Sequence, residues 1–332
     1  MINKIVKLIL VTLLFGSITL GSKHVFADSI SKQTGYSISP IFSENQTTDI
    51  DSFYDIKWTP NNNEKFSLKI TNNTDSTKNY SVEVNKARTN SNAAVDYTDT
   101  TKENQSAPYK LTQMINLPSE VKVPAHSSEI VPGNLVFPEE DFNGILMAGI
   151  HVSEKKSVDK QTPLSNTVSY NIPFVVRGNV DKRPDPRIDL QKLMLKKSTI
   201  ETYSLNVFLN NKRPNLLKSV KVKAEITDEN GKILVTDSKK LDITPETEFA
   251  YPVALPASTK AGKYTLTLSM QHGSEHHWKF TREFSISKQD QKNIKEAAPN
   301  KIDSKLLYSG VIIIISVLMG AIVYKRRQNT NK

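Results

Sequence analysis

The stretch Tyr264-Thr-Leu-Thr-Leu-Ser-Met270 alternates apolar and polar residues without a break. Successive side chains of a β-strand point to opposite faces, so this period of two predicts a strand with one face in a core and the other in water. Lys65–Asn72 (KFSLKITN) has the same pattern in the first half of the chain. The two stretches predict a half-buried antiparallel sheet in each half of the protein.

Working outward, further short runs of strand composition occur in both halves, separated by turn residues. They are Tyr36–Pro40, Phe53–Trp58, Tyr80–Val84, Ser128–Phe137, Gly144–Val152, Thr167–Val176, Ser204–Leu209, Val220–Ile226, Phe249–Leu255 and Trp278–Ile286. Asn230-Gly231 lies between two such runs and predicts a hairpin. Since no long helical period appears, we expect an all-β fold of two immunoglobulin-like antiparallel β-sandwiches.

The boundary between the sandwiches is predicted at residues 178–186 (GNVDKRPDP), a polar stretch with two prolines that is typical of a short stiff linker. The first sandwich then covers residues 28–177 and the second residues 187–287. Residues 88–108 form a predicted loop with too few apolar residues to enter a core. Residues 288–305 are polar and charged, and we expect a stalk there.

Near the C-terminus, Leu306–Tyr324 (LLYSGVIIIISVLMGAIVY) contains no charged residue and is followed directly by Lys325, Arg326 and Arg327. As a helix this stretch would span roughly 30 Å, the thickness of the hydrocarbon core of a bilayer. A buried core helix is the alternative, but this run is apolar on all faces. The sequence therefore predicts a single transmembrane helix, with residues 325–332 as a cytoplasmic tail.

The N-terminus has the pattern of a secretory signal peptide. Lys4 and Lys7 precede the apolar run Leu8–Leu20, and Val25-Phe26-Ala27 is a small-x-small cleavage signal. We expect residues 1–27 to be removed by cleavage after Ala27, with an uncleaved N-terminal anchor as the alternative. The predicted location is the cell membrane, with a single span, an extracellular N-terminal part and a cytoplasmic C-terminus.

The amino-acid composition limits the kind of organism and the binding partners that we expect for this protein. The chain has no cysteine, whereas exported eukaryotic domains of this size usually carry disulfides, so a Gram-positive bacterial surface is favoured. The formal net charge is +10, part of it in the two membrane-directed ends. Basic faces would favour anionic wall polymers electrostatically, the alternative being a solvated surface without a partner. No nucleic-acid partner is expected, because export removes the opportunity and no binding motif occurs.

The sequence lacks recognisable catalytic and metal-binding motifs. The sequence has no Gly-x-Ser-x-Gly, no His-Glu-x-x-His and no nucleotide-binding fingerprint. Three histidines, His272, His276 and His277, lie in a polar segment that predicts a hairpin turn, with a weak metal site as the alternative. Glu139-Glu140-Asp141 reads as a solvated bend. We predict no catalytic residue, no metal and no cofactor.

Aromatic side chains are the remaining candidates for contact with sugars. Tyr36, Phe42, Tyr54, Trp58 and Tyr97 are the predicted glycan contacts, although most of them are expected in the core.

Trp278 in the second sandwich is expected to be buried. Its predicted neighbours in that core are Tyr264 and Leu268.

Several collinear blocks of the chain resemble the WxL-interacting protein family of low-GC Gram-positive bacteria. In the first half they are Tyr36–Gln46, Lys65–Thr74, Val84–Tyr97, Phe137–Glu154 and Asn166–Asn179, and in the second half Arg187–Leu195, Val207–Ile226, Phe249–Leu255, Lys260–Leu268 and Trp278–Ile286. The resemblance implies a first domain that binds peptidoglycan and a second that binds host or partner proteins. It also implies association with surface proteins that carry WxL domains, and host matrix proteins as further partners.

Two positions depart from the pattern of that family. Ala148-Gly149 stands where members often have Gly-Gly, and Ala93-Ala94 stands where Asn-Gly is usual. The second departure is expected to reshape the loop around it.

The function hypothesis is a non-enzymatic, membrane-anchored surface protein that binds peptidoglycan and scaffolds WxL-type surface proteins or host ligands. The alternatives are a cell-wall-modifying enzyme and a surface assembly chaperone that uses strand addition.

Overall fold

The computed structural model describes residues 35–297 apart from 48, 102, 104–106, 156–167 and 198–201. The predicted signal peptide, the predicted span Leu306–Tyr324 and the predicted tail lie outside these residues. Over the described ranges, no helix combines the length and the apolar character that a membrane crossing requires. The chain divides into two compact units, Met1–Ala87 with Asp96–Pro184, and Arg88–Val95 with Asp185–Lys332.

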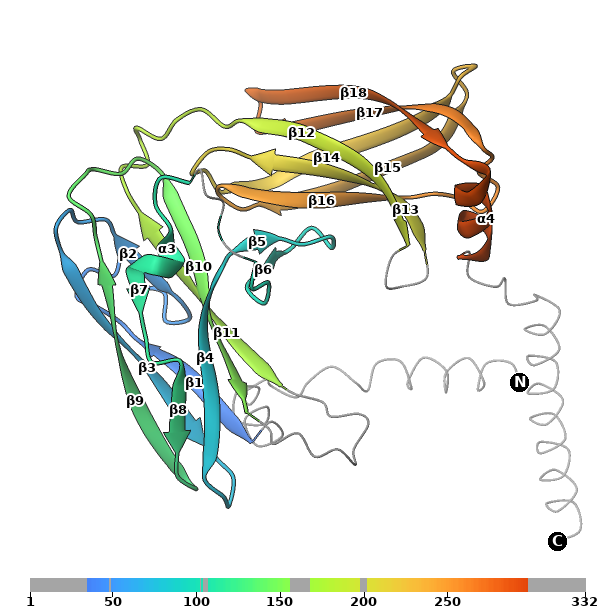
Figure 1. Ribbon diagram of the computed structural model, residues 1–332. Helices are drawn as coiled ribbons and strands as arrows, with labels where there is room; N and C mark the ends of the chain where they lie inside the picture. Colours follow the sequence, from blue (N-terminus) through green and yellow to red (C-terminus); the bar gives the residue numbers. More distant parts are fainter. Residues whose placement is uncertain are drawn as a thin grey trace, which may run out of the picture. The chain divides into compact units, whose positions relative to one another are not determined.

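Unit 1 contains two sheets (Figure 1). The first has the strand order β1 (Tyr36–Ile41), β3 (Asn63–Asn72), β9 (Ser127–Val136) and β7 (Ile115–Asn116). The second has the order β2 (Tyr54–Lys57), β11 (Ser169–Arg177), β10 (Ile145–Glu154), β4 (Lys78–Lys86) and β8 (Glu120–Val123). Neighbouring strands are antiparallel except for the parallel pair β2 and β11. A short helix, α3, covers Leu111–Met114.

The core of unit 1 lies between its sheets and is rich in aromatic rings. Tyr54 is fully buried and its ring centroid lies 5.0 Å from that of Phe66 and 4.9 Å from that of Phe174. These three side chains come from β2, β3 and β11, so both sheets contribute to one cluster. Such tilted and edge-on pairs add to the stabilisation that burial of the rings provides.

Unit 2 also contains two sheets. One has the order β12 (Ile188–Lys197), β13 (Tyr203–Asn211) and β16 (Thr247–Ala254). The other has the order β15 (Ile233–Ile243), β14 (Leu217–Asp228), β17 (Gly262–His272) and β18 (His276–Ile286). The helix α4 (Lys288–Glu296) follows β18, and the small hairpin of β5 (Arg88–Thr89) and β6 (Val95–Asp96) contributes Arg88–Val95 to this unit.

The predicted all-β class is confirmed, and the sheets are arranged as sandwiches. The predicted hairpin at Asn230-Gly231 is also confirmed, because it joins β14 to β15. Gly231 has φ +77°, a conformation that glycine adopts without steric cost. The division between the units falls after Pro184, inside the stretch that the sequence predicts as a linker.

Two segments differ from the prediction. Residues 288–296 of the predicted stalk form α4, whose Ile294 is buried in the core of unit 2. Residues 88–95 of the predicted loop belong to unit 2, where the Thr89 hydroxyl donates a hydrogen bond to the Asp242 carbonyl oxygen at 2.8 Å. Both segments are polar overall and are held by only a few buried contacts, which explains why composition alone misassigned them.

The expected burial of Trp278 and its expected contact with Tyr264 are also wrong. Trp278 pairs across strands with Met270, whereas Tyr264 pairs with Phe284 and Leu268 pairs with Phe280. The side chain is half-buried at the margin of the core, because β18 is an edge strand and has a neighbour on one side only.

Candidate binding surfaces

The outer face of the second sheet of unit 1 carries rows of polar side chains that run across three strands. The register places His151 of β10 between Glu83 of β4 and Asn171 of β11. The next row toward the end of β4 is Asn85, Gly149 and Pro173. Side chains on alternate positions share a face, so both rows lie on one side of the sheet. Their core-side neighbours, such as Ile150, are fully buried.

The row of Glu83, His151 and Asn171 supplies both hydrogen-bond donors and acceptors. His151 Nδ1 lies 2.8 Å from Asn171 Oδ1, within hydrogen-bond distance. The other ring nitrogen of His151, the amide N–H groups of Asn171 and the carboxylate oxygens of Glu83 are then available to a ligand. This combination suits the hydroxyl groups of a sugar.

Tyr97 covers the neighbouring row. A Cβ placed on Gly149 would lie 2.5 Å from the Tyr97 ring, so the absence of a side chain at residue 149 lets the ring lie against β10. The Asn85 amide donates to the Tyr97 carbonyl oxygen at 3.0 Å and fixes the backbone there. Burial raises the pKa of the Tyr97 hydroxyl to about 12, so it stays protonated and can donate. We call Glu83, Tyr97, Gly149, His151 and Asn171 the Tyr97 face.

The five aromatic residues predicted to contact glycan differ in burial. Tyr36, Tyr54 and Trp58 are buried, with 1%, 0% and 6% of their surfaces exposed, so they cannot stack on a ligand, and this part of the prediction is wrong. Their polar atoms find backbone partners inside the unit, as when the Trp58 indole N–H donates to the Glu140 carbonyl oxygen at 3.1 Å. Phe42 and Tyr97 are partly exposed, and glycan contact by these two stays a prediction.

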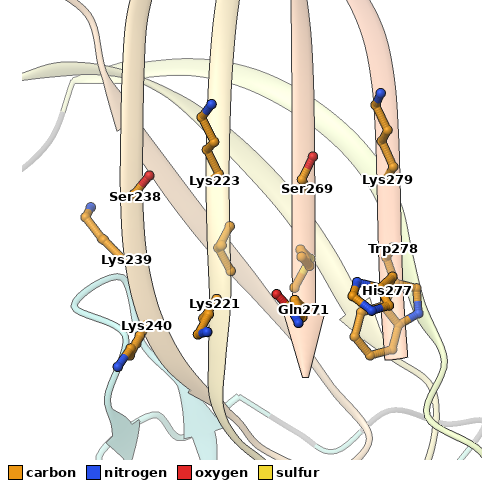
Figure 2. A pocket seen from close by; sticks show the side chains of 12 residues that line it. Lys221, Lys223, Ser238, Lys239, Lys240, Ser269, Gln271, His277, Trp278 and Lys279 are labelled. Atoms are coloured by element: carbon orange, nitrogen blue, oxygen red, sulfur yellow. The ribbon is translucent and has the colours of Figure 1, made fainter. Parts of the chain in front are cut away.

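Unit 2 has a depression of about 710 Å³ on its four-stranded sheet (Figure 2). Eight of its lining residues form two rows across the strands, and we call these eight the lysine trough. The first row is Lys240, Lys221, Gln271 and His277, and the second is Ser238, Lys223, Ser269 and Lys279. The remaining lining residues alternate with these along each strand, and none belongs to the three-stranded sheet. The depression therefore lies over the outer face.

The trough is strongly basic. Its four lysines are exposed, and Lys223 is the one that forms an ion pair within the part of the chain that the structure describes, with Nζ 3.5 Å from Glu225 Oε2. Lys239 lies between the rows but faces the opposite side of the sheet, where its ammonium group lies 5.3 Å from the centre of the Tyr251 ring. Burial and a hydrogen bond to Asp237 raise the pKa of the Tyr251 hydroxyl, so it remains neutral beneath the trough.

The predicted histidine turn lies beside the trough. His272 and His276 are a cross-strand pair with ring centroids 6.0 Å apart, and His277 contacts the Ser274 carbonyl oxygen at 2.9 Å. Across the described residues, no group of three histidine, cysteine or acidic side chains is arranged to hold a metal ion.

The domain composition follows from comparison with known families. Residues 36–154 match the peptidoglycan-binding domain of WxL-interacting proteins, and residues 159–296 match the host-binding domain of the same proteins. The chain belongs to the WxL-interacting protein family. Both matched domains are binding domains rather than enzyme domains. In this member of the family, four residues of the Tyr97 face (Glu83, Tyr97, Gly149 and His151) lie within the first match. Asn171 lies within the second match, as does the lysine trough.

Among solved structures, the chain is similar to fimbrial chaperones at low identity. The class 5 fimbriae chaperone CfaA is 14% identical over 75% of this chain and 98% of the chaperone, with a TM-score of 0.31. The Escherichia coli chaperone DraB is 17% identical over 70% and 94% of the two chains, and the Pseudomonas aeruginosa chaperone CupB2 is 10% identical over 70% and 97%, each with a TM-score of 0.27. No function is inferred from superpositions this weak. No curated relative matches the chain.

Sequence reasoning missed both surfaces in this WxL-interacting protein, apart from Tyr97. Glu83, His151 and Asn171 are each unremarkable polar positions on a strand, and only the register brings them together. The four trough lysines were visible as polar positions in alternating runs. Four lysines on one face of a sheet indicate a basic surface. This grouping can be recognised only when the strand order β15-β14-β17-β18 is known.

Proposed function

We propose that this protein is a non-enzymatic surface protein of a Gram-positive bacterium that binds peptidoglycan through unit 1 and a surface or host protein through unit 2. A C-terminal membrane anchor holds it, and it scaffolds surface proteins with WxL domains. The observation that carries the proposal is the match of both halves, in order, to the two binding domains of one family.

The Tyr97 face is the proposed glycan site of unit 1. An aromatic ring beside a row of donors and acceptors can pack against a sugar ring while its hydroxyls are paired. Gly149 supports this assignment, because any larger residue would push the Tyr97 ring from the strand. Of the partly exposed aromatics predicted from sequence, Tyr97 is the one that lies next to such a row.

The test is retention of the purified Asp28–Lys301 segment on wall sacculi. Tyr97→Ala and the double variant His151→Ala/Asn171→Ala should lose most retention. Phe42→Ala is the matched control, since it truncates another partly exposed aromatic of the same unit whose ring lies 5.8 Å from Tyr54. This control should bind like the parent.

Three results would contradict the proposal. Full retention of both Tyr97-face variants on sacculi would show that the Tyr97 face does not bind glycan. Loss of retention in Phe42→Ala alone would move the site to the other aromatic. Release of soluble muropeptides by the parent protein would show that it is a wall hydrolase and not a non-enzymatic scaffold.

A further inference from the structure

The lysine trough contains a pair of like charges that destabilises the fold. Lys221 of β14 and Lys240 of β15 are direct cross-strand partners on the outer face. Like charges directly opposite each other destabilise a sheet. Neither ammonium group has an ion-pair partner in the part of the chain that the structure describes. An anion lying across the two strands would relieve this repulsion.

The second row extends the positive surface across the sheet. Lys223 and Lys279 lie on either side of Ser269 in this row (Figure 2). With strands about 4.8 Å apart and alternate residues about 6.8 Å apart, the cations of the trough lie at intervals of about 5–15 Å. Cations spaced in this way on three of the four strands match a chain of repeated negative charges better than one small anion.

The eight residues of the trough differ in composition from an ordinary protein interface. Binding energy at such interfaces comes mainly from aromatic and other large anchors in dry pockets. The exposed large apolar side chains of unit 2, among the residues described, are Met194 and Ile233, and neither lines the depression. Its apolar lining residues are the buried Val222 and Met270 and the half-buried Trp278. Lysine ammonium groups, serine hydroxyls and the Gln271 amide supply donors for oxyanions instead.

We propose that the lysine trough binds a linear polymer whose repeating anionic groups are phosphates. Lysine binds phosphate as a point charge, without the paired geometry that arginine offers to a planar carboxylate. Ser269 lies between Lys223 and Lys279, and Ser238 lies beside Lys223 at the edge of the sheet, so both hydroxyls can donate to phosphate oxygens. The site is additional to the peptidoglycan site of unit 1 and lies in the unit whose proposed partners are proteins.

The experiment measures the affinity of the full chain, purified in detergent, for inorganic polyphosphate at several salt concentrations. Lys221→Gln/Lys240→Gln/Lys279→Gln should weaken binding at least about tenfold, since each phosphate contact adds about 0.7 to the slope of log affinity against log salt. The control Lys232→Gln/Lys260→Gln/Lys263→Gln removes the same charge from exposed lysines of unit 2 outside the trough. This control should retain nearly all the affinity.

A second measurement separates binding from folding. Lys240→Gln should raise the melting temperature of the free protein, because it removes the Lys221–Lys240 repulsion, and should lower the affinity for polyphosphate. A variant that merely damaged the fold would lower both.

The proposal is overturned if the two triple variants lose affinity equally, or if polyglutamate of matched length binds as tightly as polyphosphate. It is also overturned if Lys240→Gln lowers the melting temperature. Tyr97→Ala keeps this test apart from the peptidoglycan proposal, because it should leave polyphosphate binding unchanged while losing retention on sacculi freed of anionic polymers.

Discussion

At the scale of single residues, unit 1 buries an ion pair. The Lys86 ammonium group lies 3.7 Å from Glu103 Oε2, and their side chains are 2% and 3% exposed. The Thr112 backbone N–H donates to the other Glu103 oxygen at 2.8 Å, which links the pair to α3. Glu103 lies in the segment that the sequence predicts as a solvated loop, so composition gave no sign that it would enter the interior.

Removing one member of this pair should destabilise unit 1 strongly. Lys86→Met or Glu103→Leu alone would break this buried ion pair by removing one of its charges, and such losses cost about 3–5 kcal/mol. The double variant Lys86→Met/Glu103→Leu should recover most of that free energy of unfolding, because apolar side chains of similar size replace both charges. Urea denaturation of the four proteins gives the coupling directly. Strictly additive losses would contradict the pairing.

The buried aromatics show where residue-level prediction stops. Their alternation with polar residues placed Tyr36 and Tyr54 on strands correctly. Burial of a tyrosine depends on whether its hydroxyl meets an acceptor, and Tyr36 finds the carbonyl oxygens of Val152 and Val168 at 3.0 and 2.9 Å. These acceptors are more than a hundred residues away in sequence. No local pattern distinguishes such a tyrosine from one on a binding surface.

At the scale of elements, α4 is a helix of polar composition that is fixed at its first turn. The Ser287 hydroxyl accepts from the Asp290 backbone N–H at 3.1 Å, and the Asp290 carboxylate accepts from the Ser287 backbone N–H at 3.0 Å. The Tyr203 hydroxyl donates to Asp290 at 3.2 Å and attaches the helix to β13. A serine followed three residues later by an acid is a known start signal of helices, but the expectation of a stalk rested on polarity alone and did not use it.

Acid should loosen α4. Hydrogen bonds from Ser287, against a smaller opposing effect of burial, lower the pKa of the Asp290 carboxyl below its ordinary 3.8. A lowered pKa in the folded state stabilises the helix above the ordinary value, and this contribution disappears as pH falls through the lowered value. NMR Cα shifts of residues 288–296 should therefore stay helical down to about pH 4 and move toward coil values below it.

The matched control for that titration is Asp290→Asn. It removes the titrating group, so its helix should already be frayed at neutral pH, and the acid transition should be absent. A transition in the parent with a midpoint above the ordinary carboxyl pKa would contradict the assignment.

At the scale of the whole molecule, the two sandwiches and the boundary near Pro184 were predictable, because strand period, turn residues and prolines are local signals. The membership of Arg88–Val95 in unit 2 was not. Thr89 meets Asp242 and Thr244 across more than 150 residues of sequence. Such a contact depends on the folded path of the chain and on no feature of the eight residues themselves.

Because Arg88–Val95 belongs to unit 2, a protein cut at the linker lacks part of this unit. A segment Asp185–Lys301 lacks Thr89, whose hydroxyl oxygen accepts from the buried Thr244 backbone N–H at 3.0 Å and whose proton goes to the Asp242 carbonyl oxygen. Each buried group left unpaired costs about 1–3 kcal/mol. For a domain of this size, each kcal/mol lowers the melting temperature by about 4 °C.

Differential scanning calorimetry should therefore show the isolated segment melting several degrees below the corresponding transition of Asp28–Lys301. Thr89→Val in the longer protein should reproduce part of that loss and leave the transition of unit 1 unchanged, because Thr89 belongs to unit 2 alone. An isolated segment as stable as unit 2 in the longer protein would mean that Arg88–Val95 adds nothing to the fold of unit 2. The protein could then be divided at Pro184 without loss.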